Sequence, residues 1–126
     1  MKPGDIVLPR FPQADLLEGK LRPALTLAIA PGAHADLLLA LITSRDYQAV
    51  PQFDEIIDPS EKDFAQTGLK TRSVIRLARL ASVEQSIVSA RLGHLSPERL
   101  KMIRGRLIKW LHEQTLQSQP SLGVGL

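Results

Sequence analysis

The sequence predicts a mainly β domain that ends in one helix. Short apolar runs, separated by proline, glycine and acidic residues, recur between residues 6 and 92. One segment, residues 97–111, instead places its apolar side chains at helical spacing. The chain has 126 residues and is 44% hydrophobic, which suffices for one continuous core. We therefore expect a single domain over residues 1–116, followed by a loose tail rich in Gln, Ser, Pro and Gly at residues 117–126.

The first part of the chain predicts four strands and one polar loop. Residues 6–8 form a short apolar run that nearby prolines end, and residues 13–20 are polar. Residues 36–43 contain an unbroken apolar run, which indicates a central strand buried on both faces, and residues 53–57 predict a shorter amphipathic strand. Residues 24–29 alternate large and small side chains, so the large ones are expected to face the core together: Leu25, Leu27 and Ile29.

The second part predicts a short helix and then more β structure. Residues 60–66 suit a turn of helix capped by Ser60. Residues 73–77 resume β character, and Arg79 interrupts the alternation, which predicts a bulge or the end of the strand there. Another strand or turn is expected at residues 86–92.

The C-terminal helix has the clearest local signals. Ser96 is a suitable N-cap, Pro97 suits the first helical position, and Glu98 is favourable in the first turn. Apolar residues follow at helical spacing over about four to five turns: Leu100, Ile103, Leu107, Trp110 and Leu111. The other face is expected to be solvated and carries the basic residues Arg99, Lys101, Arg104, Arg106 and Lys109.

The net charge of +3 conceals a strong separation of charge along the chain. Residues 70–109 contain ten basic and two acidic residues, whereas residues 46–63 contain six acidic residues and one basic residue. This separation predicts a basic surface that suits a polyanion or an acidic partner segment. The alternative interpretation is a solvated helix face beside an acidic loop.

Several classes of function are excluded or disfavoured by composition. The chain has no cysteine, which excludes disulfides and cysteine-ligated metal sites. Its three histidines lack metal-ligand spacing, and it has neither a glycine-rich phosphate loop nor a nucleophile elbow. The longest apolar run, residues 37–42, is far shorter than the roughly 20 residues of a membrane span. We expect a cytoplasmic protein with no metal, no cofactor and no membrane association.

Two positions are candidates for binding an anion. Arg22 precedes Pro23 at the start of a predicted strand, and the proline favours an extended conformation for Arg22. A fixed guanidinium matches the geometry of a phosphate, although a solvated arginine at a strand start is the alternative. Thr43 and Ser44 follow the buried strand at residues 36–43, where hydroxyl groups are held rigidly yet remain open to solvent.

Five blocks of the sequence occur in the order found in the MazF/PemK growth-inhibitor toxins, which the chain resembles. They are Gly4-Asp5-Ile6-Val7-Leu8, Gly19-Lys20-Leu21-Arg22-Pro23-Ala24-Leu25, Ile42-Thr43-Ser44, Ser73-Val74-Ile75-Arg76-Leu77 and Leu92-Gly93-His94-Leu95-Ser96. Residues 79–82 lack the arginine of a Gln-x-Arg-Thr segment that is frequent in the MazF branch, which favours the PemK-like branch. The resemblance implies an SH3-like small barrel of the MazF/CcdB kind with a C-terminal helix, commonly a homodimer.

The resemblance also implies the toxin of a type II toxin-antitoxin pair. Such a protein is a metal-independent, sequence-selective endoribonuclease that cleaves single-stranded RNA through the RNA 2′-hydroxyl, inhibits translation and growth, and is blocked by an acidic antitoxin. Arg22 and Thr43 match the family's arginine and threonine, so Arg22 is expected to stabilise charge and is a candidate proton donor, while Thr43 orients the reacting groups. The general base stays open. Expected substrate contacts are Ser44, Lys20, Arg72 and Arg76.

Two other functions are compatible with the sequence. A non-catalytic barrel could bind nucleic acid or a protein through residues 70–109, and would then bind RNA in a salt-dependent way without forming a product. A gyrase inhibitor on the same fold, as in the CcdB toxins, would act in a supercoiling assay. If the protein binds RNA, few aromatic side chains are available to stack on a base: Phe11, Tyr47 or Phe53.

Overall fold

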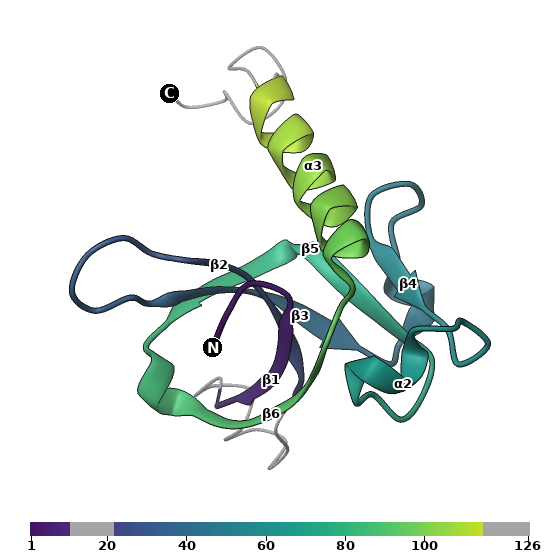
Figure 1. The fold of residues 1–126 in the computed structure, drawn as a ribbon. Helices are drawn as coiled ribbons and strands as arrows, with labels where there is room; N and C mark the ends of the chain where they lie inside the picture. Colours follow the sequence, from purple (N-terminus) through teal and green to yellow (C-terminus); the bar gives the residue numbers. More distant parts are fainter. Residues whose placement is uncertain (11–21, 115–126) are drawn as a thin grey trace, which may run out of the picture.

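The computed structural model describes residues 1–10 and 22–114, which form a half-barrel of antiparallel strands and a C-terminal helix (Figure 1). The sheet has the strand order β4-β5-β3-β2-β1-β6. The strands are β1 (Asp5–Pro9), β2 (Ala24–Ile29), β3 (Leu37–Thr43), β4 (Glu55–Ile57), β5 (Ser73–Val83) and β6 (Val88–His94). The helices are α2 (Phe64–Thr67), α3 (Pro97–Glu113) and the 3-10 turns η1 (Asp46–Gln48) and η2 (Gln85–Ile87). The predicted loop at residues 13–20 and tail at residues 117–126 lie outside the described residues.

β3 is a central strand, as its apolar sequence predicted. It lies between β2 and β5 in the sheet. Leu37 and Leu39 belong to a small apolar cluster on one face, whereas Ala40 and Ile42 belong to the main core on the other face. The strand is therefore covered on both sides, which explains why it has no polar side chain before Thr43.

A register shift in β2 changes which side chains share a face. The shift lies between Thr26 and Ala28, so Leu27 is an extra residue relative to β3. An extra residue reverses the alternation of the residues that follow it. As a result Leu25 packs in the main core, but Ile29 packs against the small cluster. The prediction that Ile29 faces the main core is wrong for this reason.

β5 contains a wider irregularity. Arg76 and Leu80 pair with adjacent residues of β3, so residues 77–79 form a bulge between them. The interruption predicted at Arg79 is confirmed as a bulge, while the strand itself continues to Val83. Bulges increase local twist, and together with the shifts in β1 and β2 they curve the sheet into a half-barrel.

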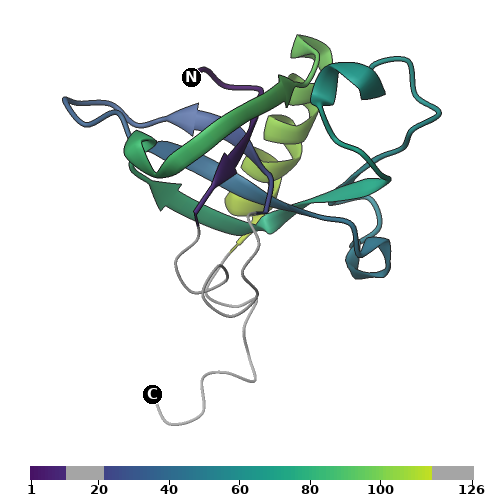
Figure 2. The same ribbon diagram turned by 90° about the horizontal axis from the view of Figure 1, so that it is seen from below.

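α2 is shorter than the helix predicted at residues 60–66, and Ser60 is not its cap. It begins at Phe64. The Ser60 hydroxyl instead donates a hydrogen bond of 2.5 Å to Asp58, whose own N–H donates to Glu61 at 2.6 Å. These local bonds favour a turn over a helix in this segment. Figure 2 shows α2 beside the end of β6.

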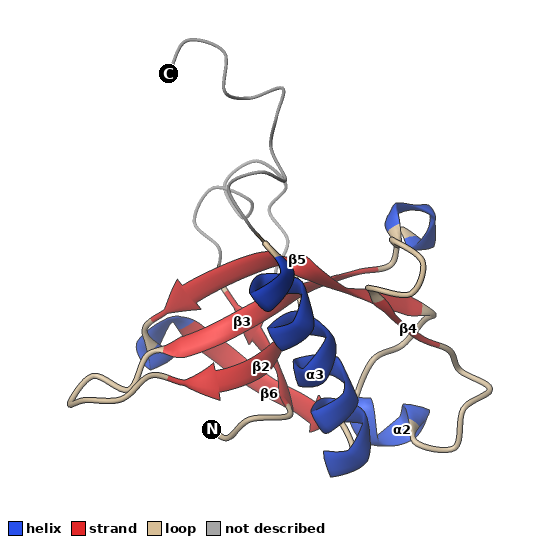
Figure 3. Ribbon diagram, turned by 90° about the horizontal axis from the view of Figure 1, so that it is seen from above, coloured by secondary structure: helices blue, strands red, loops and turns tan. Residues whose placement is uncertain are grey.

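α3 begins as predicted and covers one face of the sheet (Figure 3). The Ser96 hydroxyl accepts a hydrogen bond from the Arg99 N–H at 3.2 Å. Trp110 packs edge-on against the ring of Phe53. Leu111 was predicted on the buried face of the helix, but it is 55% exposed. In the described part of the chain, neither helix has the length and hydropathy of a membrane span. The buried face consists of Leu100, Ile103 and Leu107.

Two glycines allow α2 and β6 to pack backbone against backbone. A Cβ atom at Gly93 would lie 2.1 Å from the carbonyl oxygen of Gln66, and one at Gly68 would lie 2.1 Å from the carbonyl oxygen of Leu92. Both oxygens belong to the backbone, so a Cβ atom at either glycine would fit only if α2 and β6 moved apart. Gly68 also has a left-handed backbone conformation, with φ of 73°.

Replacing Gly93 with alanine is expected to destabilise the fold by about 1–3 kcal/mol, because the new methyl group overpacks this contact. The measurement is the free energy of unfolding in urea. Gly105→Ala is the matched control, since a Cβ at Gly105 meets nothing within 4 Å and alanine favours a helix by about 0.5–1 kcal/mol. Equal stability of the two variants would contradict the proposed packing role of Gly93.

Candidate active site

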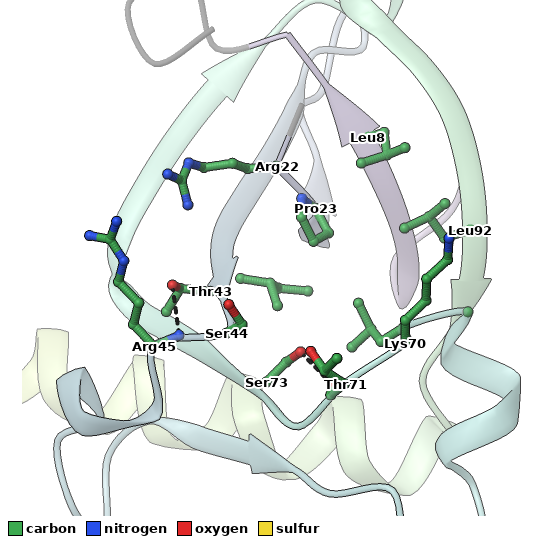
Figure 4. Close-up of a pocket in the computed structure, with 13 residues that line it drawn as sticks. Leu8, Arg22, Pro23, Thr43, Ser44, Arg45, Lys70, Thr71, Ser73 and Leu92 are labelled. Atoms are coloured by element: carbon green, nitrogen blue, oxygen red, sulfur yellow. Dashed lines mark hydrogen bonds between the residues drawn. The ribbon is translucent and has the colours of Figure 1, made fainter. Parts of the chain in front are cut away.

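The structure brings Arg22, Thr43 and Ser44 together in one pocket at an end of the half-barrel (Figure 4). The pocket lies between the start of β2, the end of β3 and the start of β5, and has a volume of about 560 Å³. Its other polar lining residues are Arg45, Lys70, Thr71 and Ser73, and its apolar ones are Leu8, Pro23, Ile42, Leu69 and Leu92. We call it the barrel-end pocket.

The pairing of β2 and β3 explains why Arg22 lies near Thr43. Pro23 has no N–H, but its carbonyl oxygen accepts a hydrogen bond from Ile42 at 3.0 Å. Arg22 is thereby attached beside the last residues of β3. Arg22 is half-buried, and Thr43 is only 7% exposed. The backbone of both residues is therefore positioned by the pairing of β2 and β3.

The Thr43 hydroxyl is oriented by the turn that follows β3. Its oxygen accepts a hydrogen bond from the backbone N–H of Arg45 at 3.1 Å, shown as a dashed line in Figure 4. Within the described residues nothing accepts a hydrogen bond from this hydroxyl, so its hydrogen is available for an acceptor in the pocket. The same turn directs the Arg45 side chain to the side where Arg22 lies (Figure 4).

A second pocket adjoins the first and is lined mainly by arginines. It has a volume of about 230 Å³ and shares Arg22, Thr43 and Arg45 with the barrel-end pocket. Its other lining residues are Leu41, Gln48, Arg76 and Arg79. We call it the arginine pocket. Of the substrate contacts predicted from sequence, Arg76 lies here.

Sequence reasoning missed Arg45 and Arg79 as site residues. Arg45 directly follows Thr43 and Ser44, and that position was the available signal. Arg79 interrupts the alternation of β5, and the bulge that results places it at the arginine pocket. Both side chains belong to exposed residues.

Arg76 is fixed by a buried carboxylate. Its Nε lies 3.1 Å from Oδ2 of Asp54, and its Nη1 donates a hydrogen bond of 3.1 Å to the side-chain oxygen of Gln48. The Asp54 side chain is 1% exposed and accepts hydrogen bonds from the backbone N–H groups of Val50 and Leu77, each at 2.9 Å. Asp54 thus ties the bulge of β5 to the segment after η1.

Arg72 lines neither of these two pockets. Its Nη1 lies 2.8 Å from Asp58 and its Nε 3.1 Å from Asp46, and hydrogen bonds to these two carboxylates raise the pKa of Arg72. Hydrogen bonds from Ser60, and then from Arg72, lower the pKa of Asp58 to about 2. The charge of Arg72 is therefore compensated within the chain. Lys20, the remaining predicted contact, lies outside the described residues.

The charge separation seen in the sequence largely disappears in the fold. All six acidic residues of segment 46–63 form ion pairs with four arginines of the basic region: Arg72, Arg76, Arg99 and Arg106. The charge of these four arginines is thus compensated within the chain, which reduces the basic surface predicted for residues 70–109. The basic residues that line the two pockets are Arg22, Arg45, Lys70, Arg76 and Arg79, and of these Arg76 is paired with Asp54.

Arg99 shows this compensation most clearly. It was predicted on the solvated face of α3, but its side chain is 11% exposed and contacts Glu55 at 2.6 Å and Glu61 and Asp63 at 3.1 Å each. Burial lowers the pKa of Arg99, but the hydrogen bond and charge of Glu55, together with Glu61, raise it overall. Arg99 therefore fastens the acidic segment to α3.

The aromatic and metal-ligating side chains offer little to this site. Phe53 packs against Trp110 with ring centroids 5.4 Å apart, which is a packing role, and Phe11 lies outside the described residues. Tyr47, in η1, is 77% exposed, so of these three aromatic residues it is the one that remains a candidate for stacking on a base.

Among residues 1–10 and 22–114, no three His, Asp or Glu side chains are grouped as metal ligands.

Solved structures that resemble this fold include two from mycobacteria. One is an endoribonuclease in complex with its cognate antitoxin from a mycobacterial species, with a TM-score of 0.62, 13% identity, and coverage of 91% of this chain and 98% of that chain. The other is the Mycobacterium tuberculosis toxin MazF-mt6, with a TM-score of 0.62, 16% identity, and coverage of 88% and 99%. At these identities the similarity concerns the fold, and it confirms the predicted mainly β barrel with a C-terminal helix.

The family itself is shown by the sequence. No curated protein matches this chain at a significant level. A family model described as PemK-like, MazF-like toxin of type II toxin-antitoxin system matches residues 2–111. This match covers most of the chain and includes both pockets. The chain belongs to the PemK-like, MazF-like toxin family of type II toxin-antitoxin systems.

Proposed function

We propose that this protein is a metal-independent endoribonuclease toxin that cleaves single-stranded RNA and thereby inhibits translation. The observation that supports this is the common location of Arg22 and Thr43 in the barrel-end pocket, with Arg45 beside them. The pocket combines permanent cations with hydroxyl groups. That combination suits a phosphodiester, which carries a negative charge and offers only acceptors on its two free oxygens.

In the proposed reaction the RNA 2′-oxygen attacks the adjacent phosphorus and the bond to the 5′-oxygen breaks. The products are a 2′,3′-cyclic phosphate and a 5′-hydroxyl, with one proton lost from the 2′-hydroxyl and one gained by the leaving oxygen. Negative charge increases on the phosphate oxygens in the transition state, where Arg22 and Arg45 stabilise it. Thr43 donates its free hydroxyl hydrogen to a phosphate oxygen, and Arg22 is also the candidate donor to the leaving oxygen.

The test is incubation of the purified protein with a long single-stranded RNA in the presence of a chelator. We expect cleavage at defined positions, and products that carry a cyclic phosphate. The same sequence made with 2′-deoxyribose should remain intact, because it lacks the attacking hydroxyl. Salt-sensitive binding to RNA with no product would instead indicate a non-catalytic barrel. Inhibition of supercoiling with no cleavage would indicate a gyrase inhibitor.

Thr43→Val is expected to lower kcat/KM for RNA cleavage by about 10- to 100-fold, because it removes a donor to the phosphate without changing side-chain size. Thr43→Ser keeps the hydroxyl and should retain most of the activity. Thr26→Val is the matched control, since the Thr26 hydroxyl is buried without a hydrogen-bond partner among the described residues and Thr26 lines neither pocket. Full activity of Thr43→Val would remove the threonine from the proposed mechanism.

A cognate antitoxin with an acidic segment is the proposed inhibitor. The carboxylates of such a segment would compete with RNA for the arginines of the two pockets, and less for Arg72, whose charge is already compensated. Binding should weaken steeply as salt increases, as measured by calorimetry between about 50 and about 500 mM NaCl, over which the Debye length falls from roughly 14 Å to roughly 4 Å. An affinity that does not change with ionic strength would contradict this mode of inhibition.

The family resemblance also implies a homodimer that acts in the cytoplasm, and both stay predictions for this chain. Sedimentation equilibrium of the purified protein tests the oligomeric state. Fractionation of cells that express the protein with its antitoxin tests the location.

A further inference from the structure

We propose that the arginine pocket binds a second phosphate of the RNA, adjacent to the scissile phosphate in the barrel-end pocket. The inference rests on the proposed function and specifies how the RNA backbone is held. In this arrangement Arg79 is a substrate-binding residue, and Arg45 contacts both phosphates.

The first argument is continuity. The two pockets share Arg22, Thr43 and Arg45 as lining residues, so they are immediate neighbours. A single-stranded nucleic acid repeats its charge at every nucleotide, and proteins that bind it usually follow the backbone with a positively charged groove. A strand with one phosphate beside Arg22 therefore has its next phosphate close to the cations of the neighbouring pocket.

The second argument is which arginines the protein leaves uncompensated. Within the described residues, Arg45 and Arg79 have no carboxylate partner, and both are exposed at the arginine pocket. The fold has six acidic residues in segment 46–63, yet all of them pair with other arginines. The described residues that line the arginine pocket include no acidic residue. This arrangement favours an external anion over an internal ion pair.

The third argument is that the pocket is rigidly built. Buried Asp54 holds Arg76, and Arg76 donates to the side-chain oxygen of Gln48. Because this bond uses the oxygen of the Gln48 amide, the NH₂ group is the part that remains for a ligand, and it can only donate. The volume of about 230 Å³ is less than half that of the barrel-end pocket and suits a phosphate group better than a whole nucleotide.

The experiment measures binding of oligonucleotides that cannot be cleaved, so it does not depend on catalysis. A short single-stranded RNA containing a mapped cleavage site is made with 2′-O-methyl ribose. In a series of such oligonucleotides, one phosphate at a time is replaced by an uncharged methylphosphonate. Affinities are measured for the wild type, Arg79→Gln, Arg79→Lys and Lys101→Gln by fluorescence anisotropy. Lys101 is an exposed basic residue of α3 that lines neither pocket, so its variant controls for the loss of one charge.

We expect one phosphate next to the scissile one at which methylphosphonate weakens wild-type binding about tenfold or more, as for a hydrogen bond between charged groups. Arg79→Gln should show a similar loss with the natural backbone and almost no further loss at that phosphate, because the two changes remove the same interaction. It should also lower the slope of log K against log salt by about 0.7, the value for one phosphate of a single strand. Arg79→Lys should recover part of the affinity.

Equal, additive effects of the methylphosphonate in the wild type and in Arg79→Gln would overturn the second phosphate site. An effect of Lys101→Gln as large as that of Arg79→Gln would do the same, since it would show a general charge effect. If Arg79→Gln binds the oligonucleotides as tightly as the wild type while Arg22→Ala still abolishes cleavage, the inference fails and the nuclease proposal stands. If the wild type neither binds nor cleaves single-stranded RNA, both fail together.

Discussion

Replacing Arg22 with alanine is expected to lower the rate of RNA cleavage by at least about a hundredfold, the size of effect seen when one preorganised group that stabilises transition-state charge is removed. Arg22 is half-buried at the start of β2 and lines both pockets, whereas Arg45, the other described arginine that lines both, is exposed. The loss should appear mainly in kcat, because the charge on the phosphate oxygens is largest in the transition state. Single-turnover cleavage of a labelled RNA gives this measurement.

Two further variants make this result specific. Arg22→Lys keeps the positive charge but lacks the planar donor fork, so it should recover activity only in part. Arg22→Ala should also keep the circular dichroism spectrum and a cooperative unfolding transition, since the main core does not include this side chain. Cleavage by Arg22→Ala at the rate of the wild type would show that the barrel-end pocket is not the site of the reaction.

The fold was predictable where local chemistry determines it. Ser96 and Pro97 define the start of α3, and the uninterrupted apolar run of β3 defines a central strand. The location of Ile29 was not predictable, because a bulge depends on the register between two strands and leaves no clear local signal. The short α2 was mispredicted because the hydrogen bonds of Ser60 compete with a helix cap.

The candidate site follows the same division. Arg22 lies just before β2 and Thr43 is the last residue of β3. These strands pair directly, so the proximity of the two residues follows from two strands with strong sequence signals. Arg72 and Arg99 were misjudged because their partners lie up to 44 residues away in the chain. A sum of charges along the sequence cannot show which of them become paired after folding. Among the described residues that line the arginine pocket, Arg45 and Arg79 are exposed and pair with no described carboxylate, so they are the arginines that we expect to bind an external anion.

Asp54→Ala is expected to produce the largest loss of stability, about 3–5 kcal/mol, which is the usual result of breaking a buried ion pair by removing one partner. The change leaves the largely buried guanidinium of Arg76 without its carboxylate. It also removes the acceptor for the N–H groups of Val50 and Leu77, which connect the bulge of β5 to the segment after η1. The measurement is the free energy of unfolding in urea at pH 7.

Asp58→Ala is the matched control, because Asp58 also pairs with an arginine and accepts hydrogen bonds but lies at the surface. Its loss of stability should be far smaller, since solvent screens a surface pair. The pKa of Asp58 is about 2 in the folded protein against an ordinary 3.8, so its contribution is complete at pH 7 and disappears as the pH falls from 4 towards 2. Equal losses for the two variants would mean that burial does not distinguish these ion pairs. A stable Asp54→Ala variant that still binds RNA like the wild type would show that the arginine pocket does not need Asp54 to hold its shape.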